Sequence, residues 1–361
     1  MALSIRRTAC MSSTVLLRVG LLAFCLLGLP RVFAQPAEAT RYGPELEGFA
    51  YPYPVQHFSF RSQGQDLQMA YMDLPARAPA TGQTVVLMHG KNFCGATWAQ
   101  TMAFLSQSGY RVVVPDQIGF CASSKPAHYQ YSFQQLARNT AALLQQLGVD
   151  RASLVGHSTG GMLAARYALM FPETVRSLLL LNPNPIGLED WKALGVPSRT
   201  PDEWFQRELR LSAEGVRQYE RAVYYGGRWK PEYDRWVDML AGLNQGPGHE
   251  LVAWNSALIY DMIFTQPVVY EFGLLKVPTT LMLGTADTTA IGSDVAPPEL
   301  RRQLGRYDRL GRQVVQTIPG GRLIEFEGLG HAPQIEEPER FHQALLVELR
   351  RQDDPGRSPG H

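Results

Sequence analysis

The chain has 361 residues, of which 45% are hydrophobic, and its 34 Lys and Arg nearly balance its 33 Asp and Glu. The hydrophobic fraction is enough to bury a large core. The formal net charge of +1 gives no basic footprint for a nucleic acid or another polyanion. Length alone permits one large or two ordinary domains.

The first 34 residues have the features of a secretory signal peptide. A basic pair, Arg6 and Arg7, precedes an apolar segment at residues 16–29, and a cleavage site ends at Ala34. The alternative is a retained anchor helix, but Pro30 interrupts the apolar run before it reaches the roughly 20 residues that span a bilayer. We therefore expect a periplasmic or secreted protein with no stable membrane span after cleavage.

Residues 35–54 form a lead-in rich in Pro, Gly and Glu, which we expect to be loosely ordered. Alternating polar and apolar residues then predict a β-hairpin at 55–60 and 67–72. Short apolar runs follow in alternation with helix-like segments, the pattern of parallel strands covered on both faces. The strands are predicted at 85–88, 111–114, 152–155, 175–181, 279–283 and 323–326, and the helices at 97–106, 132–147, 161–170 and 338–350. This order predicts a mostly parallel, doubly wound α/β sheet that begins with an antiparallel hairpin.

Between residues 183 and 275 the alternation stops. This segment, which follows the sixth strand, contains helix-like pieces and many Trp and Tyr residues. An insertion of this length in an α/β domain is usually a lid or cap. Its aromatic side chains can line an apolar pocket or pack the cap's own core, and we expect both. The sheet and the cap form one domain at 55–352, and a polar tail at 353–361 is expected to fray.

The pentapeptide Gly156-His157-Ser158-Thr159-Gly160 lies between the strand at 152–155 and the helix at 161–170. A G-x-S-x-G sequence alone is a weak signal, but at a strand-to-helix turn it is the nucleophile elbow. The turn is so tight that Ser158 must adopt a strained conformation, and the flanking glycines let neighbouring backbones pass. Ser158 Oγ is thereby presented above the sheet, beside the first N–H groups of the helix.

With this elbow the chain resembles the α/β-hydrolase family in its single-cap form, over residues 55 to 350. The resemblance identifies His331, in the Gly-x-x-His segment after the last strand, as the base that takes the proton of Ser158. It identifies Asp287, in the loop after the penultimate strand, as the carboxylate that holds the imidazole. The rival position after the strand at 175–181 reads Asn182-Pro183-Asn184 and has no carboxylate.

The oxyanion hole is expected to use two backbone donors. One is the N–H of Thr159, directly after the nucleophile. The loop after His89-Gly90 resembles the family's H-G-x element, which implies Lys91 N–H as the other donor and Asn92 as a second candidate, with His89 orienting the loop. The Lys91 side chain could strengthen the oxyanion site or point to solvent, and we expect it to point to solvent.

Cys94 and Cys121 are the two cysteines outside the signal peptide. They follow the strands at 85–88 and 111–114, whose ends both reach the catalytic face, with the elbow strand between or beside them according to the order of the sheet. In an oxidising compartment such a pair can form a disulfide, and two buried free thiols are the alternative. The family has D-x-x-G-x-G-x-S in the second of these loops, where Cys121 replaces the second Gly and Asp116 is expected to stabilise the turn.

These features predict an exported serine hydrolase, carboxylesterase-like, that cleaves an ester or related acyl bond through an acyl-enzyme. A nucleophilic serine excludes the haloalkane dehalogenases and epoxide hydrolases of the family, which attack with a carboxylate. C–C bond hydrolases, lactonases and perhydrolases remain as alternatives, with a ligand-binding receptor module as the non-enzymatic one. No metal or cofactor motif is present in the sequence, and the triad needs neither. The expected partner is a small acyl substrate with an apolar part, and no nucleic acid.

Overall fold

A computed structural model describes residues 40–77, 79–183, 189 and 191–351. All of them belong to one unit, Ala39–His361. The predicted signal peptide, the start of the lead-in and the predicted tail at 353–361 lie outside the described residues. No helix of the described part has the length and apolar character needed to cross a membrane.

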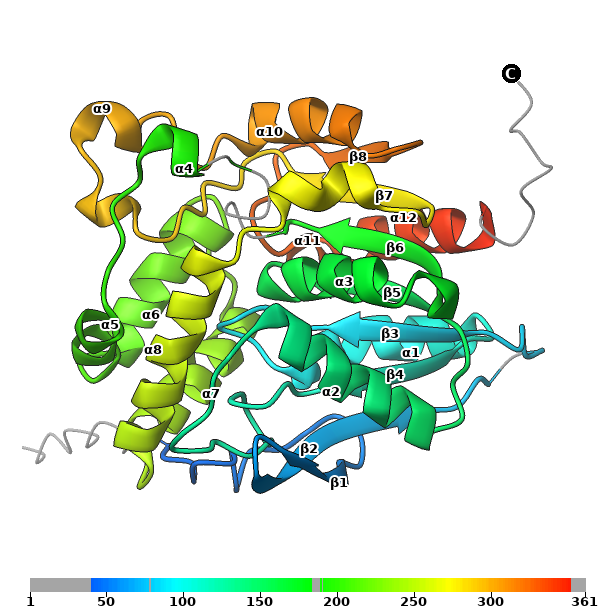
Figure 1. Ribbon diagram of the computed structural model, residues 1–361, viewed down its shortest axis with the longest axis horizontal. Coiled ribbons are helices and arrows are strands. Elements are labelled where there is room, and N and C mark those ends of the chain that lie inside the picture. Colours follow the sequence, from blue (N-terminus) through cyan, green and yellow to red (C-terminus); the bar gives the residue numbers. More distant parts are fainter. Residues whose placement is uncertain (1–39, 78, 184–188, 190, 352–361) are drawn as a thin grey trace, which may run out of the picture. The chain divides into compact units, whose positions relative to one another are not determined.

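An eight-stranded sheet runs through this unit in the order β1-β2-β4-β3-β5-β6-β7-β8 (Figure 1). Its strands are β1 (Gln56–Ser62), β2 (Gln65–Leu74), β3 (Thr84–Met88), β4 (Arg111–Pro115), β5 (Ala152–His157), β6 (Val175–Leu181), β7 (Thr279–Gly284) and β8 (Arg322–Phe326). β1 pairs antiparallel with β2, and β2 with β4, whereas all other pairs are parallel. The predicted fold class, a mostly parallel sheet with an N-terminal hairpin, is confirmed.

Helices cover both faces of the sheet because its central strands carry apolar side chains on both sides. On one face Leu154 and Leu178 pack against α2 (Phe133–Gln146) and α3 (Thr159–Met170). On the other face, Val155 and its neighbours pack against α1 (Ala99–Gln107), which follows the short helix η1 (Gly95–Trp98), and against α12 (Pro338–Arg351). Figure 1 shows α2 and α3 in front of the sheet, with α1 and α12 behind it.

Two helices between β7 and β8 were not predicted: α9 (Pro298–Arg301) and α10 (Tyr307–Val314). The amphipathic α10 buries Tyr307, Leu310 and Val314 in the same core as the leucines of β7. Gly311 lies where the helix touches the sheet, and a Cβ there would meet Leu283 Cδ1 at 2.4 Å. This helix extends the cover of the sheet to its β7–β8 edge.

The predicted cap is present between β6 and β7 as a layer of helices over the C-terminal ends of the parallel strands (Figure 1). Its elements are α4 (Trp191–Leu194), α5 (Pro201–Glu208), α6 (Ala213–Tyr219), the π-helix η4 (Glu220–Tyr224), η5 (Pro231–Tyr233), α7 (Asp234–Asn244), α8 (His249–Thr265) and η6 (Val269–Leu274).

The described part of the lead-in, residues 40–54, is packed rather than loose. Leu46 is buried, and Tyr42 N–H donates to the Gly242 carbonyl of α7 at 3.0 Å. Tyr51 Oη donates to Asp116 Oδ2 at 2.5 Å. The lead-in thus joins the cap to the loop after β4, which its Pro- and Gly-rich composition did not reveal.

Glu220, at the start of the π-helix, is a buried carboxyl whose two oxygens have no hydrogen-bond partner in the described residues. Burial raises the pKa of Glu220 to about 8, although the charge of Arg217 opposes this shift. An unfolded glutamate ionises near pH 4.3. Between that pH and about 8 the unfolded chain gives up a proton that the folded chain keeps, so Glu220 makes folding less favourable as pH rises.

Glu220→Gln is therefore expected to stabilise the protein by up to roughly 4 kcal/mol at pH 7.5 and to have little effect at pH 4.5. Denaturant unfolding at both pH values measures the difference. Glu214→Gln, on the exposed face of α6, is the control and should show no such pH dependence. An effect of Glu220→Gln that is equal at both pH values would contradict the assignment of a protonated Glu220.

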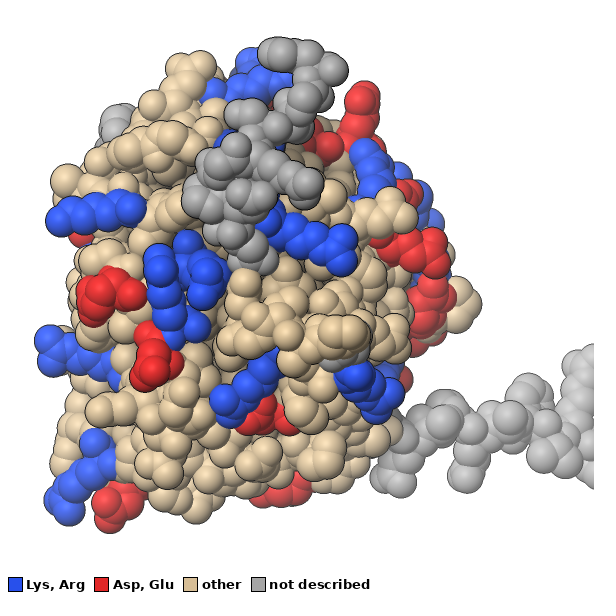
Figure 2. All heavy atoms as spheres, turned by 90° about the vertical axis from the view of Figure 1, so that its right-hand side faces the viewer, with Lys and Arg blue, Asp and Glu red and all other residues tan. Residues whose placement is uncertain are grey.

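On the face where the parallel strands begin, Lys and Arg side chains are interspersed with Asp and Glu (Figure 2). This mixture accords with the near-zero net charge of the chain.

Candidate active site

Ser158 lies at the turn from β5 into α3 with φ 55° and ψ −120°, a strained conformation for a residue with a side chain. The flanking glycines cannot be replaced without a clash. A Cβ on Gly156 would lie 2.3 Å from the Gly160 carbonyl oxygen, and one on Gly160 would lie 2.4 Å from the Met88 carbonyl oxygen. Ser158 N–H donates to the Leu181 carbonyl of β6 at 3.0 Å. The sequence motif thus folds into the predicted elbow.

Asp287 and His331 lie together in the interior, as predicted. His331 Nδ1 donates to Asp287 Oδ2 at 2.6 Å, and both side chains are almost fully buried. Thr289 donates to Asp287 Oδ1 from its backbone N–H at 2.8 Å and from Oγ1 at 2.6 Å. These donors fix the carboxylate so that it faces one nitrogen of the imidazole.

Asn182 supports this pair, a role that the sequence analysis missed. Its Nδ2 donates to Asp287 Oδ2 at 2.8 Å, and its Oδ1 accepts from Gly284 N–H at 2.9 Å. It adopts a left-handed conformation, φ 36°, at the end of β6. The position of Asn182 could have indicated this role, because it directly follows the strand next to the nucleophile strand. In the sequence, the position showed only that no carboxylate is present there.

His331 Nε2, opposite Asp287, has no hydrogen-bond partner in the described residues. No hydrogen bond from Ser158 Oγ to Nε2 is recorded among them; such catalytic bonds are often long before substrate binds. The loop of His331 is nevertheless attached to the elbow, because His157 Nε2 donates to the His331 carbonyl at 2.8 Å. Burial lowers the pKa of His157 well below its usual value, so this neighbour is neutral scaffolding.

The proposed oxyanion loop passes directly over the nucleophile. A Cβ on Gly90 would lie 3.0 Å from Ser158 Cβ. The N–H groups of Lys91 and Asn92 donate to no acceptor in the described residues, whereas Phe93 N–H donates to the Gly90 carbonyl at 3.2 Å. His89 orients the loop as expected: Nδ1 donates to the Gly90 carbonyl at 2.8 Å, and Nε2 accepts from Gln117 N–H at 3.2 Å.

The expectation that the Lys91 side chain points to solvent is wrong. Lys91 Nζ lies under the cap, 3.1 Å from Glu208 Oε2 of α5 and 2.6 Å from Ser256 Oγ of α8. It also lies 3.7 Å from the ring centroid of Tyr260. Burial lowers the pKa of Lys91, and the charge of Glu208 opposes that shift. The cap helices cover the loop, so the ammonium is satisfied by protein groups instead of water.

Tyr224, in the π-helix of the cap, contacts both halves of the site. Its ring stacks on the imidazole of His331 with centroids 4.6 Å apart, and its carbonyl accepts from His331 N–H at 2.8 Å. Its hydroxyl accepts from Asn92 Nδ2 at 2.9 Å. A Cβ on Gly330 would lie 2.0 Å from the Tyr224 carbonyl oxygen, so only glycine fits before the histidine. The sequence predicted that the cap is rich in aromatic residues, but it could not identify Tyr224 as the one that contacts the site.

We expect Tyr224→Leu to lower kcat by roughly 10- to 100-fold with little change in KM, because the imidazole loses its stacking partner and becomes less well oriented. Tyr224→Phe keeps the ring and should lose less. Steady-state ester hydrolysis measures both. The adjacent Tyr225→Phe is a matched control, because the buried Tyr225 hydroxyl has no partner in the described residues. Equal kcat in all three variants would rule out the positioning role.

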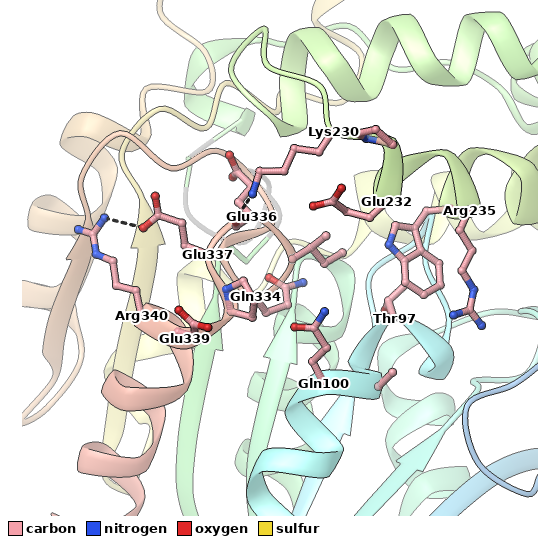
Figure 3. A pocket seen from close by; sticks show the side chains of 15 residues that line it. Thr97, Gln100, Lys230, Glu232, Arg235, Gln334, Glu336, Glu337, Glu339 and Arg340 are labelled. Atoms are coloured by element: carbon pink, nitrogen blue, oxygen red, sulfur yellow. Dashed lines mark hydrogen bonds and ion pairs between the residues drawn. The ribbon is translucent and has the colours of Figure 1, made fainter.

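In the described residues, a small cavity of about 40 Å³ beside Lys91, Asn92 and Phe93 and two larger cavities lie near the site. One of about 290 Å³ in the cap is lined by Asn92 of the oxyanion loop and by cap residues that include Tyr219 and Tyr260. The other, of about 730 Å³, lies between the start of α1, residues 230–236, the short α11 (Pro333–Glu336) and α12 (Figure 3). Most of the residues that line it are polar or charged, and none of the three proposed catalytic residues lines either cavity.

Glu336 in that second cavity joins the cap to the histidine loop. Its Oε1 accepts from Gly330 N–H at 2.6 Å, and its Oε2 accepts from Arg228 at 2.9 Å. Lys230 Nζ donates to the Glu336 carbonyl at 2.9 Å (Figure 3). Together with Tyr224, these contacts make the cap part of the support for the loop that contains His331.

Cys94 and Cys121, the candidate disulfide pair, are buried and have no bond between them in the structure. Each has another contact: Cys94 Sγ donates to Met239 Sδ at 3.1 Å, and Cys121 Sγ lies 3.6 Å from the Phe93 carbonyl oxygen. Asp116 stabilises the turn as expected, since Oδ1 accepts from Gly95 N–H at 2.6 Å and Oδ2 from Ala122 N–H at 3.2 Å.

Comparison with known proteins gives the family. The sequence profile of the α/β-hydrolase fold matches residues 83–234. A crystal structure described as "a probable hydrolytic enzyme" from Pseudomonas aeruginosa is 61% identical, covers 86% of this chain and 99% of its own, and superposes with a TM-score of 0.84. RutD of Pantoea ananatis, whose name assigns it carbamate hydrolysis, is 27% identical over 78% of this chain and 94% of its own.

A third relative, 2-hydroxy-6-oxo-2,4-heptadienoate hydrolase of Pseudomonas putida, is 30% identical over 45% of this chain and 66% of its own. The fold, the elbow and these matches lead to one conclusion: the chain is a member of the α/β-hydrolase family.

Proposed function

We propose that the protein is an exported serine hydrolase that cleaves a carboxylic ester or a related acyl bond through Ser158, His331 and Asp287. The observation that carries the proposal is the arrangement at the elbow. Ser158 is strained at the elbow, and the adjacent His157 is hydrogen-bonded to the carbonyl of His331. The Nδ1 of His331 is held by Asp287, and its Nε2 has no partner in the described residues.

The chemistry follows from these positions. With Nδ1 donating to Asp287, Nε2 is the nitrogen able to accept the proton of Ser158 Oγ as the oxygen attacks the acyl carbon. Asp287 stabilises the imidazolium that forms. Nε2 then returns the proton to the leaving group, and a water molecule hydrolyses the acyl-enzyme by the same route.

The negative oxygen of the tetrahedral intermediate would be held by the N–H groups of Lys91 and Thr159, with Asn92 N–H as the second candidate. The N–H of Thr159 is at the first turn of α3, where no helical acceptor exists. Loss of one such donor typically costs about 3 kcal/mol of transition-state stabilisation. The reaction needs no metal or cofactor.

The cap cavity is the candidate site for the apolar part of the substrate. Leu211, Val216 and Leu240 contribute apolar side chains to it, and Asn92 joins it to the oxyanion loop. Lactonase, C–C hydrolase and perhydrolase activities share the acyl-enzyme chemistry and stay as alternatives. A receptor module without catalysis is disfavoured, because such a protein has no need of the Asp287–His331 contact.

Labelling with a fluorophosphonate tests the proposal. Covalent attachment should occur at Ser158 and be absent in Ser158→Ala, and a series of p-nitrophenyl esters of increasing chain length then defines the acyl preference. A wild-type protein that is folded but neither reacts with the probe nor hydrolyses any ester of the series would overturn the assignment.

A further inference from the structure

A pair of cysteines lies beside the proposed oxyanion loop. Cys94 follows Asn92 and Phe93 in that loop, and Cys121 is in the loop after β4. The two loops are neighbours because β3 and β4 pair in the sheet. The sulfur atoms and a carboxylate oxygen of Asp116 all lie within 4.8 Å of one another. Two thiols that are 27 positions apart in the sequence therefore lie close together in the fold.

The backbone conformation at Cys121 indicates that a cysteine is present there for its side chain. Its φ is 41°, in the left-handed region where a Cβ is unfavourable and glycine is favoured. Gly119, two residues earlier in the same loop, is a glycine at φ 91°. A cysteine at this position has a conformational cost that a glycine would avoid, and the gain it offers is a sulfur atom opposite Cys94.

The same atoms do not form a convincing metal site. The Asp116 carboxylate already accepts hydrogen bonds from Gly95 N–H, Ala122 N–H and the Tyr51 hydroxyl. Burial raises the pKa of the Cys121 thiol well above its usual value, and its neighbour Cys94 adds to the shift. Metal ligation and thiol–disulfide exchange both need a thiolate, so either reaction has to take place before Cys121 is buried. The chemistry that remains for two adjacent thiols is their joint oxidation.

We propose that Cys94 and Cys121 form a disulfide as the chain folds in an oxidising compartment. Two S–H bonds break and one S–S bond forms. The two electrons and two protons pass to a disulfide-bonded oxidant, which is reduced to two thiols. Because both cysteines are buried in the folded protein, the exchange takes place before α7 of the cap covers Cys94.

The bond ties the oxyanion loop to the loop after β4. It also removes the hydrogen that Cys94 donates to Met239, and so releases one contact between the oxyanion loop and the cap. By cross-linking the segment that contains α1 and β4, it restricts the unfolded chain and raises the thermal stability of the folded one. This inference rests on the proposed export of the protein but not on the catalytic assignment.

Refolding the chain in a mixture of reduced and oxidised glutathione tests the proposal. After thiol alkylation and digestion without reductant, mass spectrometry should find the Cys94 and Cys121 peptides linked, with the loss of two hydrogens. Addition of reductant should lower Tm by roughly 5 to 10 °C. The Cys94→Ser/Cys121→Ser variant should have the lower Tm with and without reductant.

Recovery of both cysteines in alkylated form after this refolding would overturn the proposal, as would a wild-type Tm that does not respond to reductant. Stoichiometric zinc or copper bound to unlinked cysteines would overturn it as well. Fluorophosphonate labelling of Ser158 is read separately, so a failure of the catalytic assignment leaves the disulfide result intact.

Discussion

Asp287→Asn is expected to lower kcat by about 10³- to 10⁴-fold while the protein remains folded. Asp287 receives hydrogen bonds from His331 Nδ1, Asn182 Nδ2 and Thr289, and each of these donors requires an acceptor. An amide at this position presents N–H groups to at least one of them. The imidazole then favours the tautomer in which Nε2 carries the proton and cannot act as the base.

Kinetics on the best ester and circular dichroism of the variant measure the effect and check the fold. Asp294→Asn is a matched control. Asp294 lies in the same loop region as Asp287, but it is exposed and pairs with Arg199. Its kcat should equal that of the wild type. Near-full activity of Asp287→Asn would require another carboxylate to orient the histidine.

Lys91→Met is expected to destabilise the protein by about 3 to 5 kcal/mol, because it leaves the buried carboxylate of Glu208 without its cation. Methionine retains most of the apolar length of the lysine side chain. The loss should therefore come from the charge and not from a cavity. Denaturant unfolding of the purified variant gives the change in free energy.

A second substitution makes the test specific. Lys91→Met/Glu208→Gln removes both charges and should recover most of the lost stability. Arg306→Met, which breaks the exposed pair with Asp308, should change nothing measurable. If the double variant were as unstable as Lys91→Met, the buried ion pair would not be the source of the effect.

The strands could be predicted closely from the sequence because each is a continuous apolar run that needs cover on both faces. The strand predicted at 175–181 coincides with β6, and the strand predicted at 152–155 is extended in β5 only to His157. The short helix α10 was not predicted because its three buried apolar side chains, those of Tyr307, Leu310 and Val314, are separated by charged residues, glutamine and glycine. Its apolar face can be recognised as part of the core only when the helix is seen packed against β7.

The residues proposed as the triad could be located from the sequence, since each follows a recognisable strand end. What the sequence could not supply were contacts between distant segments. Lys91 is hydrogen-bonded to Glu208 and Ser256 on two different cap helices, and no local sequence pattern predicts such partners. Tyr224 is one of many aromatic residues in the cap, and only the folded chain shows that it is the one stacked on His331.

The attachment of the cap to the histidine loop limits how the substrate range of this protein can be changed. A cap without residues equivalent to Tyr224, Arg228 and Lys230 would bring its own pocket but would lose the contacts that these residues make with the loop around His331. Exchange of the cap as a module would thus alter specificity and disturb catalysis together. Substitutions in the wall of the cap cavity, at Leu211 or Val216, leave those contacts in place and are the better starting point for engineering.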